Sequence, residues 1–454
     1  MVPQWIIEKK RNGQALTDED IGFFIRSYAN GAIPDYQMAA LAMAITLQGM
    51  SPGETAALTQ SMLQSGSILD TSSLRNPKID KHSTGGIGDK ISLILAPLVA
   101  CCGIAVPMIA GRGLGLTGGT IDKLESIPGY RTQLDEAAFL HVLNTCGCSI
   151  IRAMDDIVPA DKKLYALRDV TGTVSSIPLI VSSILCKKLA ARIDGLVLDV
   201  KWGSGAFMTT RTDAEALARA LVETGQQLGL RIAALLTDMN QPLGQAVGNA
   251  LEVAESVEVL RGHGPADVVA LTLELGARML MMGRVDADRK QALGQLRARL
   301  ESGEAFERLK TMVRLHGGDP RALDDPARLP SAAIRKPLTA RRAGFIQAVN
   351  AEAIGRVALL LGAGRMCITD TIDPAAGVAT LKKVGDQVTT GETLVILHTN
   401  RQDPLEEALA LCTNAFRITA ESVSPPPLIT LEIKSTKGSD FKTPGEGTGP
   451  TDLL

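Results

Sequence analysis

A short segment near residue 80 combines the side chains and glycines that hold phosphate in proteins. Residues 80–89 read DKHSTGGIGD, which places Lys81, two hydroxyls and three glycines directly before an apolar run that predicts a helix from Ser92 to Cys101. Glycines let backbone N–H groups approach an anion, a helix amino terminus adds positive potential, and a lysine adds a full charge. A structural turn is the alternative, but the lysine and the hydroxyls together favour a phosphate site.

A second glycine-rich loop follows the apolar segment 104–109. Residues 111–120 read GRGLGLTGGT, whose glycine spacing differs from the dinucleotide-binding fingerprint, and no acidic residue is suitably placed downstream. Loops that follow parallel strands meet at one edge of a sheet, which is where α/β proteins bind ligands. We therefore expect both glycine loops to converge on one ligand, with a purely structural loop as the alternative.

A third group of polar side chains stands on a predicted helix that begins after Ser176. Ser183 and Lys187 are four residues apart, so they share one helix face, and Arg168 lies a short way upstream. Ile180 belongs to the same helix, so the polar pair stands on an otherwise apolar element. Polar residues on a helix are more often simply solvated, and the pattern alone leaves both interpretations open.

The first part of the chain predicts a small helical unit. Thr17 and Ser51 are each followed three residues later by an acidic residue, which is the capping-box pattern of a helix start. Residues 160–192 are helical again. We expect them to dock on residues 1–67 and form one discontinuous all-α domain.

Residues 75–155 and 193–330 alternate short Ile- and Val-rich runs with longer helical stretches. This alternation is typical of a large α/β domain with a mostly parallel sheet. The expected strands include 104–109, 195–200 and 232–236, and the expected helices include 212–228, with Thr212 as its N-cap, and 247–260.

The pattern changes again after about residue 330. Residues 376–397 alternate short strands with turns, so residues 335–433 predict a β-rich α+β C-terminal domain. Residues 434–454 are rich in Gly, Pro and Thr and predict a disordered tail.

The composition excludes several classes of partner. Lys and Arg total 47 and Asp and Glu total 49 in 454 residues, a formal net charge of −2, so no overall field draws the chain to nucleic acid or to an anionic membrane. The chain has 2 Trp, 4 Tyr and 8 Phe, too few for a surface that stacks single-stranded bases.

The cysteines and the start of the chain indicate the compartment. Seven cysteines, an odd number, stand mostly in apolar surroundings, which predicts buried free thiols in a reducing compartment. Cys146 and Cys148 lack the two-residue spacer of a redox or zinc pair. The sequence shows neither a signal-peptide pattern nor an apolar run of membrane-spanning length. We therefore expect a cytoplasmic protein with no metal site.

Five segments together resemble the thymidine and pyrimidine-nucleoside phosphorylases. In colinear order they read KHSTGG from Lys81, GRGLG from Gly111, DKLES from Asp122, YALRD from Tyr165 and DVKWGSGAFM from Asp199. The resemblance extends from about residue 5 to about residue 433. It implies a homodimer whose small α domain and large α/β domain flank a cleft, with phosphate and nucleoside on opposite walls.

Carried over position by position, the resemblance implies two groups of site residues. The phosphate group is Lys81, Ser83, Ser92 and Thr120, and the pyrimidine group is His82, Arg168, Ser183 and Lys187. The implied reaction is reversible phosphorolysis, in which a pyrimidine nucleoside and inorganic phosphate give the free base and ribose or deoxyribose 1-phosphate. Phosphate is a co-substrate, and no cofactor or protein nucleophile is implied. Arg168 and Lys187 would stabilise negative charge on the leaving pyrimidine, and His82 would hydrogen-bond or protonate a base oxygen.

The chain departs from the family pattern in both glycine loops. Ala110 stands where relatives usually have Ser, which removes one phosphate hydroxyl, and Leu116 stands where they usually have His, which puts catalytic efficiency in question more than fold. Some relatives hold a monovalent cation at positions matching Gly88, Leu243, Ala246 and Glu255. Lys90 lies beside these positions, and we expect its ammonium to take the place of the cation against Glu255.

Two other functions are compatible with the sequence. An anthranilate-type phosphoribosyltransferase would share the architecture and the phosphate loop, but it needs magnesium-bound pyrophosphate, and no matching acidic cluster lies near the loops. A non-catalytic nucleoside or phosphate sensor would fit Leu116 and Ala110, but the four pyrimidine-group residues favour an enzyme. The choice between uridine and thymidine depends on pocket shape and stays open.

Overall fold

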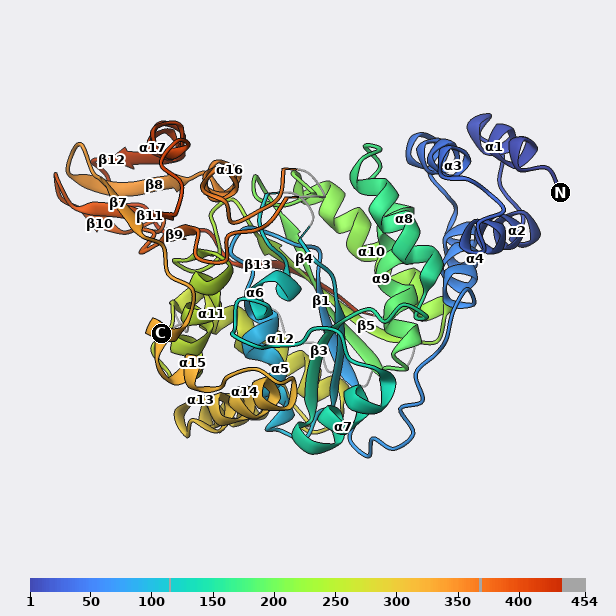
Figure 1. Ribbon diagram of the computed structural model, residues 1–454, viewed down its shortest axis with the longest axis horizontal. Coiled ribbons are helices and arrows are strands. Elements are labelled where there is room, and N and C mark those ends of the chain that lie inside the picture. Colours follow the sequence, from blue (N-terminus) through green and yellow to red (C-terminus); the bar gives the residue numbers. More distant parts are fainter. Residues whose placement is uncertain (114–115, 367–369, 435–454) are drawn as a thin grey trace.

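The computed structural model describes residues 1–113, 116–366 and 370–434. It confirms the predicted fold class, because a helical domain, an α/β domain with mostly parallel strands and a β-rich third part lie side by side (Figure 1). Residues 114–115 of the second glycine loop, Cys367 and the predicted tail beyond residue 434 lie outside the described residues.

The helical domain combines two segments that are far apart in the sequence. Its helices are α1 (Pro3–Arg11), α2 (Asp18–Ala29), α3 (Asp35–Gln48), α4 (Pro52–Leu63), α8 (Pro159–Asp169) and α9 (Ile177–Ala190). α9 packs against α4, and α8 packs against α2 and α3. Thr17 and Ser51 form the predicted capping boxes of α2 and α4.

The α/β domain is built on parallel strands. β1 (Ile79–Ser83), β4 (Gly195–Trp202) and β5 (Arg231–Asp238) pair in that order, and β2 (Val106–Ala110) pairs with β3 (Cys148–Arg152). A single parallel bridge between Lys78 and Ala105 joins the two groups at their amino ends. Because the strands are parallel, the loops that follow β1, β2 and β4 leave the same edge.

The last described strand differs from the prediction. β13 (Ile429–Lys434) pairs antiparallel with β5 at the edge of the central sheet, although the sequence places this segment at the end of the C-terminal domain. Such pairing depends on contacts between residues nearly two hundred positions apart, as between Ile429 and Thr237. Local sequence patterns do not carry this information.

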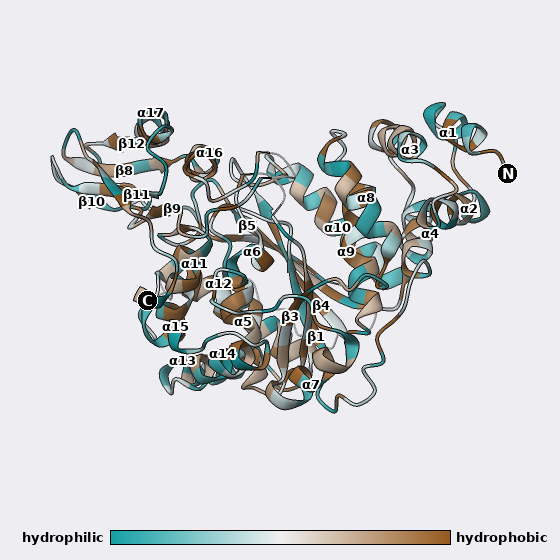
Figure 2. Ribbon diagram, in the orientation of Figure 1, coloured by the Kyte–Doolittle hydropathy of each residue, from teal (hydrophilic) through white to brown (hydrophobic). Residues whose placement is uncertain are grey.

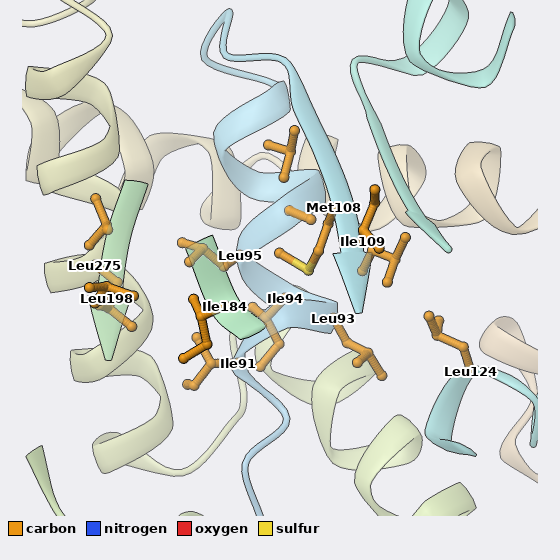
Figure 3. Close-up of a cluster of buried hydrophobic side chains, with 14 of the residues drawn as sticks. Ile91, Leu93, Ile94, Leu95, Met108, Ile109, Leu124, Ile184, Leu198 and Leu275 are labelled. Atoms are coloured by element: carbon orange, nitrogen blue, oxygen red, sulfur yellow. The ribbon is translucent and has the colours of Figure 1, made fainter. Parts of the chain in front are cut away.

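The helices of the α/β domain pack on its strands or on one another. They are α5 (Ile91–Ala100), α6 (Thr120–Leu124), α7 (Glu136–Cys146), α10 (Arg211–Gln227), α11 (Asn249–Leu260), α12 (Ala266–Met282), α13 (Arg289–Glu301), α14 (Glu304–Leu315), α15 (Arg321–Asp324) and the 3₁₀ turn Pro326–Arg328. Every residue of α5 is buried, and Figure 3 shows Leu93 and Ile94 beside Met108 and Ile109 of β2. Figure 2 shows the corresponding contrast between hydrophobic central elements and the more hydrophilic outer helix α13.

Two predicted helix starts are wrong by about two residues. α10 begins at Arg211, because Thr210 rather than Thr212 is the N-cap, and its Oγ1 accepts a hydrogen bond from the Asp213 backbone N–H at 3.1 Å. α11 begins at Asn249, because the two preceding residues form the short strand β6 (Val247–Gly248).

The C-terminal part is rich in β-strands, as predicted, and its strands pair antiparallel. Its elements are β7 (Ile334–Thr339), β8 (Gly344–Val349), α16 (Ala351–Leu361), β9 (Gly377–Ala379), β10 (Gln387–Val388), β11 (Thr393–Thr399), α17 (Leu405–Ala415) and β12 (Phe416–Thr419). β6 of the α/β domain pairs with β9, so the two parts share a sheet.

The six cysteines within the described residues are free thiols, as predicted. Five are buried, and Cys101 is partly exposed. Cys146 and Cys148 lie close together, with their sulfur atoms 3.9 Å apart.

A buried histidine is expected to make the fold sensitive to acid. His316 stacks on Tyr130 with ring centroids 4.4 Å apart, and its ring nitrogens face Ser149 Oγ at 2.9 Å and the Arg131 carbonyl at 2.8 Å. Burial lowers the pKa of His316 from 6.5 to about 4. Between these pH values the unfolded chain binds a proton that the folded chain does not, so stability falls as pH falls, by about 3 kcal/mol over the full window.

We therefore expect the melting temperature of the wild type to fall more between about pH 7 and about pH 4 than that of His316→Gln, which keeps an amide in place of the titrating ring. His141→Gln, at an exposed position of α7, is the matched control. Its melting temperature is expected to fall with pH as much as that of the wild type. If the melting temperatures of the wild type and His316→Gln fell equally with pH, His316 would not be the source of the acid sensitivity.

Candidate active site

A cavity of about 440 Å³ lies between the α/β domain and the helical domain. The loops that follow β1, β2 and β4 form one wall, and side chains of α8 and α9 form the other. Glu352, near the start of α16, adds one residue from the C-terminal part. The two glycine loops therefore face the same cavity, at the edge where the parallel strands end.

Seven of the eight predicted site residues line this cavity. They are Lys81, His82, Ser83, Ser92, Thr120, Arg168 and Ser183. Lys187 is not among the lining residues, although its ammonium reaches Ser183. Position alone does not establish a role, so the roles of all eight stay predictions.

Lys81 is a buried ammonium without a hydrogen-bond partner within the described ranges. It is 1% exposed, and Asp89 Oδ1 lies 3.8 Å from its Nζ, beyond hydrogen-bond distance. Burial lowers the pKa of Lys81, and the nearby carboxylates of Asp89 and Asp199 partly oppose this shift. A buried cation that lines a cavity and lacks a hydrogen-bond acceptor is stabilised by an anion placed in that cavity.

Three lysines surround Asp89 at the end of the first glycine loop. Lys81 and Lys201 lie 3.8 and 3.9 Å from its carboxylate, and Lys123 Nζ donates to its backbone carbonyl at 2.6 Å. Burial opposes the charge, but Lys81, Lys201 and Lys123 together hold the pKa of Asp89 well below its usual range. Asp89 is therefore an anion within the loop. Lys201 also pairs with Asp199 at 2.7 Å and Lys123 with Glu252 at 2.8 Å, so Lys81 is the lysine of the three that lacks a closer carboxylate among the described residues.

Asp122 organises the second glycine loop, a role that the sequence analysis missed. Its Oδ2 accepts hydrogen bonds from the backbone N–H groups of Gly113 and Gly119 at 2.8 and 2.9 Å, and its Oδ1 pairs with Arg112 and Arg365 at 2.9 and 2.8 Å. Although burial opposes its charge, these bonds, led by Arg365, lower the pKa of Asp122. The DKLES motif contains the residue, but its partners are visible only in the fold.

Arg168, on α8, is fixed by the turn that leads into α9. Its guanidinium donates to the backbone carbonyls of Thr173, Val174 and Leu179 at 3.2, 2.6 and 3.1 Å. Burial lowers the pKa of Arg168, but an arginine remains charged at physiological pH. These bonds use three of its five N–H donors and hold a positive charge in the cavity wall.

Lys187 and Ser183 form a polar unit on α9. Lys187 Nζ donates to Ser183 Oγ at 2.9 Å and to Asp161 Oδ2 at 2.5 Å, and it lies 5.5 Å from the ring centroid of Tyr165. Asp161 and Tyr165 are both on α8, so the charge of Lys187 is positioned by the neighbouring helix. Sequence reasoning found the pair on α9 but missed Asp161, whose side chain meets Lys187 only because α8 and α9 pack together.

His82 is neutral at physiological pH. Burial, followed by the positive charges of Lys188, Lys187 and Lys81, lowers its pKa well below 6.5. A neutral imidazole donates one hydrogen bond and accepts another. His82 is therefore suited to hydrogen-bond a ligand in the cavity and holds no extra proton before the ligand arrives.

Several lining residues were not predicted. Lys188 is fully buried, pairs with Asp80 at 2.6 Å and lines the cavity beside the first loop. Phe207, in the loop after β4, is exposed and lines the cavity, as does Glu352. The motif DVKWGSGAFM could have suggested Phe207, whereas nothing in the local sequence marks Glu352.

The two departures from the family pattern both lie at the cavity. Ala110 and Leu116 are lining residues. A Cβ atom added to Gly355 of α16 would lie 3.1 Å from Leu116 Cδ1, so Leu116 packs closely against that helix. Leu116 is thus an apolar contact between the second glycine loop and the C-terminal part.

The position expected for a monovalent cation is filled by the Lys90 side chain. Lys90 Nζ lies 2.5 Å from Glu255 Oε2, as predicted from the sequence, and also donates to the carbonyls of Leu243 and Ala246. The residues present therefore do not fit a resident cation at this point.

No group of three or more His, Cys, Asp or Glu side chains within the described residues is placed to hold a metal ion. None of the helices in those ranges is both long enough and apolar enough to cross a membrane.

Comparison with known families covers most of the chain. The family described as "Glycosyl transferase family, helical bundle domain" matches residues 4–66, and "Glycosyl transferase family, a/b domain" matches residues 75–306. "Pyrimidine nucleoside phosphorylase C-terminal domain" matches residues 345–419. Among solved structures, anthranilate phosphoribosyltransferase from Thermus thermophilus superposes with a TM-score of 0.57 and 20% identity, covering 68% of this chain and 99% of that one. At this identity the likeness concerns the fold alone.

Curated relatives are much more similar. Pyrimidine-nucleoside phosphorylases from Staphylococcus aureus strains USA300 and COL are each 48% identical over 420 residues, which cover 92% of this chain and 97% of the relative. Together with the matched domains, this places the protein among the glycosyltransferases. The chain belongs to the pyrimidine-nucleoside phosphorylase family.

Proposed function

We propose that the protein catalyses the reversible phosphorolysis of pyrimidine nucleosides, with uridine, thymidine and deoxyuridine as substrates. The observation that carries the proposal is the cavity itself. On one side it has the buried Lys81 beside a glycine loop, and the Nζ of this lysine has no hydrogen-bond partner among the described residues. On the other side it has Arg168 and Ser183, and Ser183 accepts a hydrogen bond from Lys187. This arrangement suits two anionic groups, a phosphate and a departing pyrimidine, on opposite walls.

In this proposal, phosphate is the nucleophile and the protein positions charge. A phosphate oxygen bonds to the anomeric carbon as the glycosidic bond breaks, and the bonding electron pair leaves with the base nitrogen. Lys81 holds the phosphate, with Ser83, Ser92 and Thr120 as its hydroxyl contacts. Because both reactants are held together, the protein lowers the entropic cost of their encounter. Inorganic phosphate is the co-substrate, and the step requires no further cofactor.

The base site handles the negative charge that arrives on the pyrimidine. Arg168 and Lys187 lie on the helical wall and stabilise that charge, and Ser183 links Lys187 to the cavity. His82 is neutral, so it donates a hydrogen bond to a base oxygen and does not deliver a preloaded proton.

The direct test is release of free base. The purified full chain is incubated with uridine or thymidine and inorganic phosphate, and both the base and the pentose 1-phosphate are quantified. We expect phosphate-dependent release of equal amounts of the two products from at least one nucleoside. Parallel reactions with anthranilate and phosphoribosyl pyrophosphate are expected to give no product. Absence of base release from either nucleoside would refute the proposal.

We also propose that the protein forms a homodimer through α1 and α3. These helices pack together and carry large exposed apolar side chains: Trp5 is 69% exposed, Tyr36 74% and Leu47 75%. We expect sedimentation to give a dimer for the wild type and a monomer for Trp5→Ser combined with Leu47→Asp. Ile68→Asp, at an exposed apolar position between the domains, is the control and stays dimeric. A dimeric double variant would exclude this surface.

A further inference from the structure

Three oxygen atoms converge on one buried point behind the first glycine loop. The carbonyl oxygens of Leu243 and Ala246 lie 2.9 and 3.1 Å from Lys90 Nζ, and Glu255 Oε2 lies 2.5 Å from it. Lys90 itself is fully buried. Two carbonyls and one carboxylate form an oxygen-only set of the kind that replaces the hydration shell of a monovalent cation. Here the occupant is the chain's own ammonium group.

The Lys90 ammonium group donates a hydrogen bond to each of the three oxygens. It has three N–H donors, and the three oxygens are its three acceptors. Burial opposes the charge, but Glu255 and then Glu252 raise the pKa of Lys90, so the group remains a cation. A Cβ atom added to Gly244 would lie 2.7 Å from Lys90 Nζ and 2.2 Å from Glu255 Oε2, so the surrounding chain is also tightly closed.

The same point joins the first glycine loop to the segment 242–246. Lys90 is the N-cap residue of α5 and directly follows Asp89, whose carboxylate faces Lys81. Leu243 donates its backbone N–H to the Ile87 carbonyl at 3.0 Å, so the two segments already run against each other. A charge at this point therefore fixes the distance between the segment 242–246 and the first glycine loop, which ends in Asp89.

We propose that Lys90 is a built-in substitute for a bound monovalent cation, and that removing its side chain converts the point into a site for K⁺ or NH₄⁺. Lys90 is a positioning residue, because it adjoins the first glycine loop but does not line the active-site cavity. The wild type needs no added cation here. In Lys90→Ala, the three oxygens remain, and the space left by the side chain admits an ion.

The test measures melting temperature in equal concentrations of KCl, NH₄Cl and tetramethylammonium chloride, whose cation is too large for the point. The wild type is expected to melt within about 1 °C in all three salts. Lys90→Ala is expected to melt about 5 °C or more below the wild type in tetramethylammonium, and to regain at least half of this loss in K⁺ or NH₄⁺. Lys90→Met, which fills the space without a charge, is expected to melt low in all three salts.

A second measurement reports on the loop. In tetramethylammonium, Lys90→Ala is expected to raise the KM for phosphate about tenfold with a smaller change for the nucleoside, and K⁺ is expected to restore it. The KM measurement rests on the proposed function, whereas the melting temperatures do not. Failure of the proposed function can therefore be told apart from failure of the cation proposal. Lys78→Ala, at a partly buried lysine that precedes β1 and pairs with Asp194, is the matched control and is expected to show no cation dependence.

Three outcomes would overturn the proposal. They are a wild type that K⁺ stabilises relative to tetramethylammonium, a Lys90→Ala variant whose melting temperature is the same in all three salts, and a Lys90→Met variant as stable as the wild type. If Lys90→Ala does not fold in any salt, the melting temperatures of the wild type and of Lys90→Met still test the proposal.

Discussion

Lys81→Met is expected to lower kcat/KM for phosphate by about 10³-fold. The Lys81 ammonium is buried, lines the cavity and has no hydrogen-bond partner within the described residues. Its charge is therefore available to an incoming anion. Lys123 also lines the cavity, but it pairs with Glu252 at 2.8 Å and is not expected to replace Lys81. Methionine keeps most of the volume of the side chain, so the loss reports on charge and hydrogen bonding.

Steady-state rates at varied phosphate concentration measure this effect. Lys78→Met is the matched control, since Lys78 lies just before the same strand but pairs with Asp194 at 3.5 Å outside the cavity. We expect its kcat/KM to stay within about twofold of the wild type. A Lys81→Met variant that retains more than about a tenth of wild-type activity would rule out Lys81 as the main phosphate contact.

Lys187→Met is expected to lower kcat/KM for the nucleoside by about 10²-fold or more. Lys187 lies on the wall opposite Lys81, held by Asp161 and bonded to Ser183, which lines the cavity. Since negative charge reaches the pyrimidine only as the bond breaks, loss of this cation should lower kcat more than it raises KM.

Two companion variants sharpen the assignment of the base site. His141→Ala, at an exposed position of α7 away from the cavity, is expected to change kcat/KM less than twofold. Asp161→Asn keeps the shape of the contact but removes its charge, and we expect an intermediate loss of about tenfold. If Lys187→Met and His141→Ala had equal effects, the base site would have to be placed elsewhere.

Local patterns predicted the parts of the fold that local interactions form. Thr17 and Ser51 predicted helix starts because a capping box is completed within four residues. The start of α10 was placed two residues late because Thr210 and Thr212 are both acceptable N-caps, and only the bond to Asp213 distinguishes them. β6 was missed because Val247 becomes a strand only by pairing with Val378, far along the chain.

The candidate site was also predicted only as far as local patterns reach. Motifs and family resemblance located the residues that line the cavity, since those residues lie in short segments. Their counter-charges come from elsewhere: Asp161 reaches Lys187 from the neighbouring helix, and Arg365 reaches Asp122 from the C-terminal part. Such pairs depend on how elements pack, which neither spacing nor composition records.

The pairing of β13 with β5 makes the C-terminal part an insertion within the α/β domain rather than an appendage at its end. The chain leaves the α/β domain after α15 and the 3₁₀ turn, builds the antiparallel sheets, and returns to the edge of the central sheet at Ile429–Lys434. The C-terminal part is also held between these ends, because β9 pairs with β6 and Arg365 bonds to Asp122. Truncation before β13 would also free the edge of β5, and an unprotected edge strand invites pairing with other chains. β13 thus covers the edge of the central sheet, and versions of this protein that are shortened before β13 are expected to aggregate.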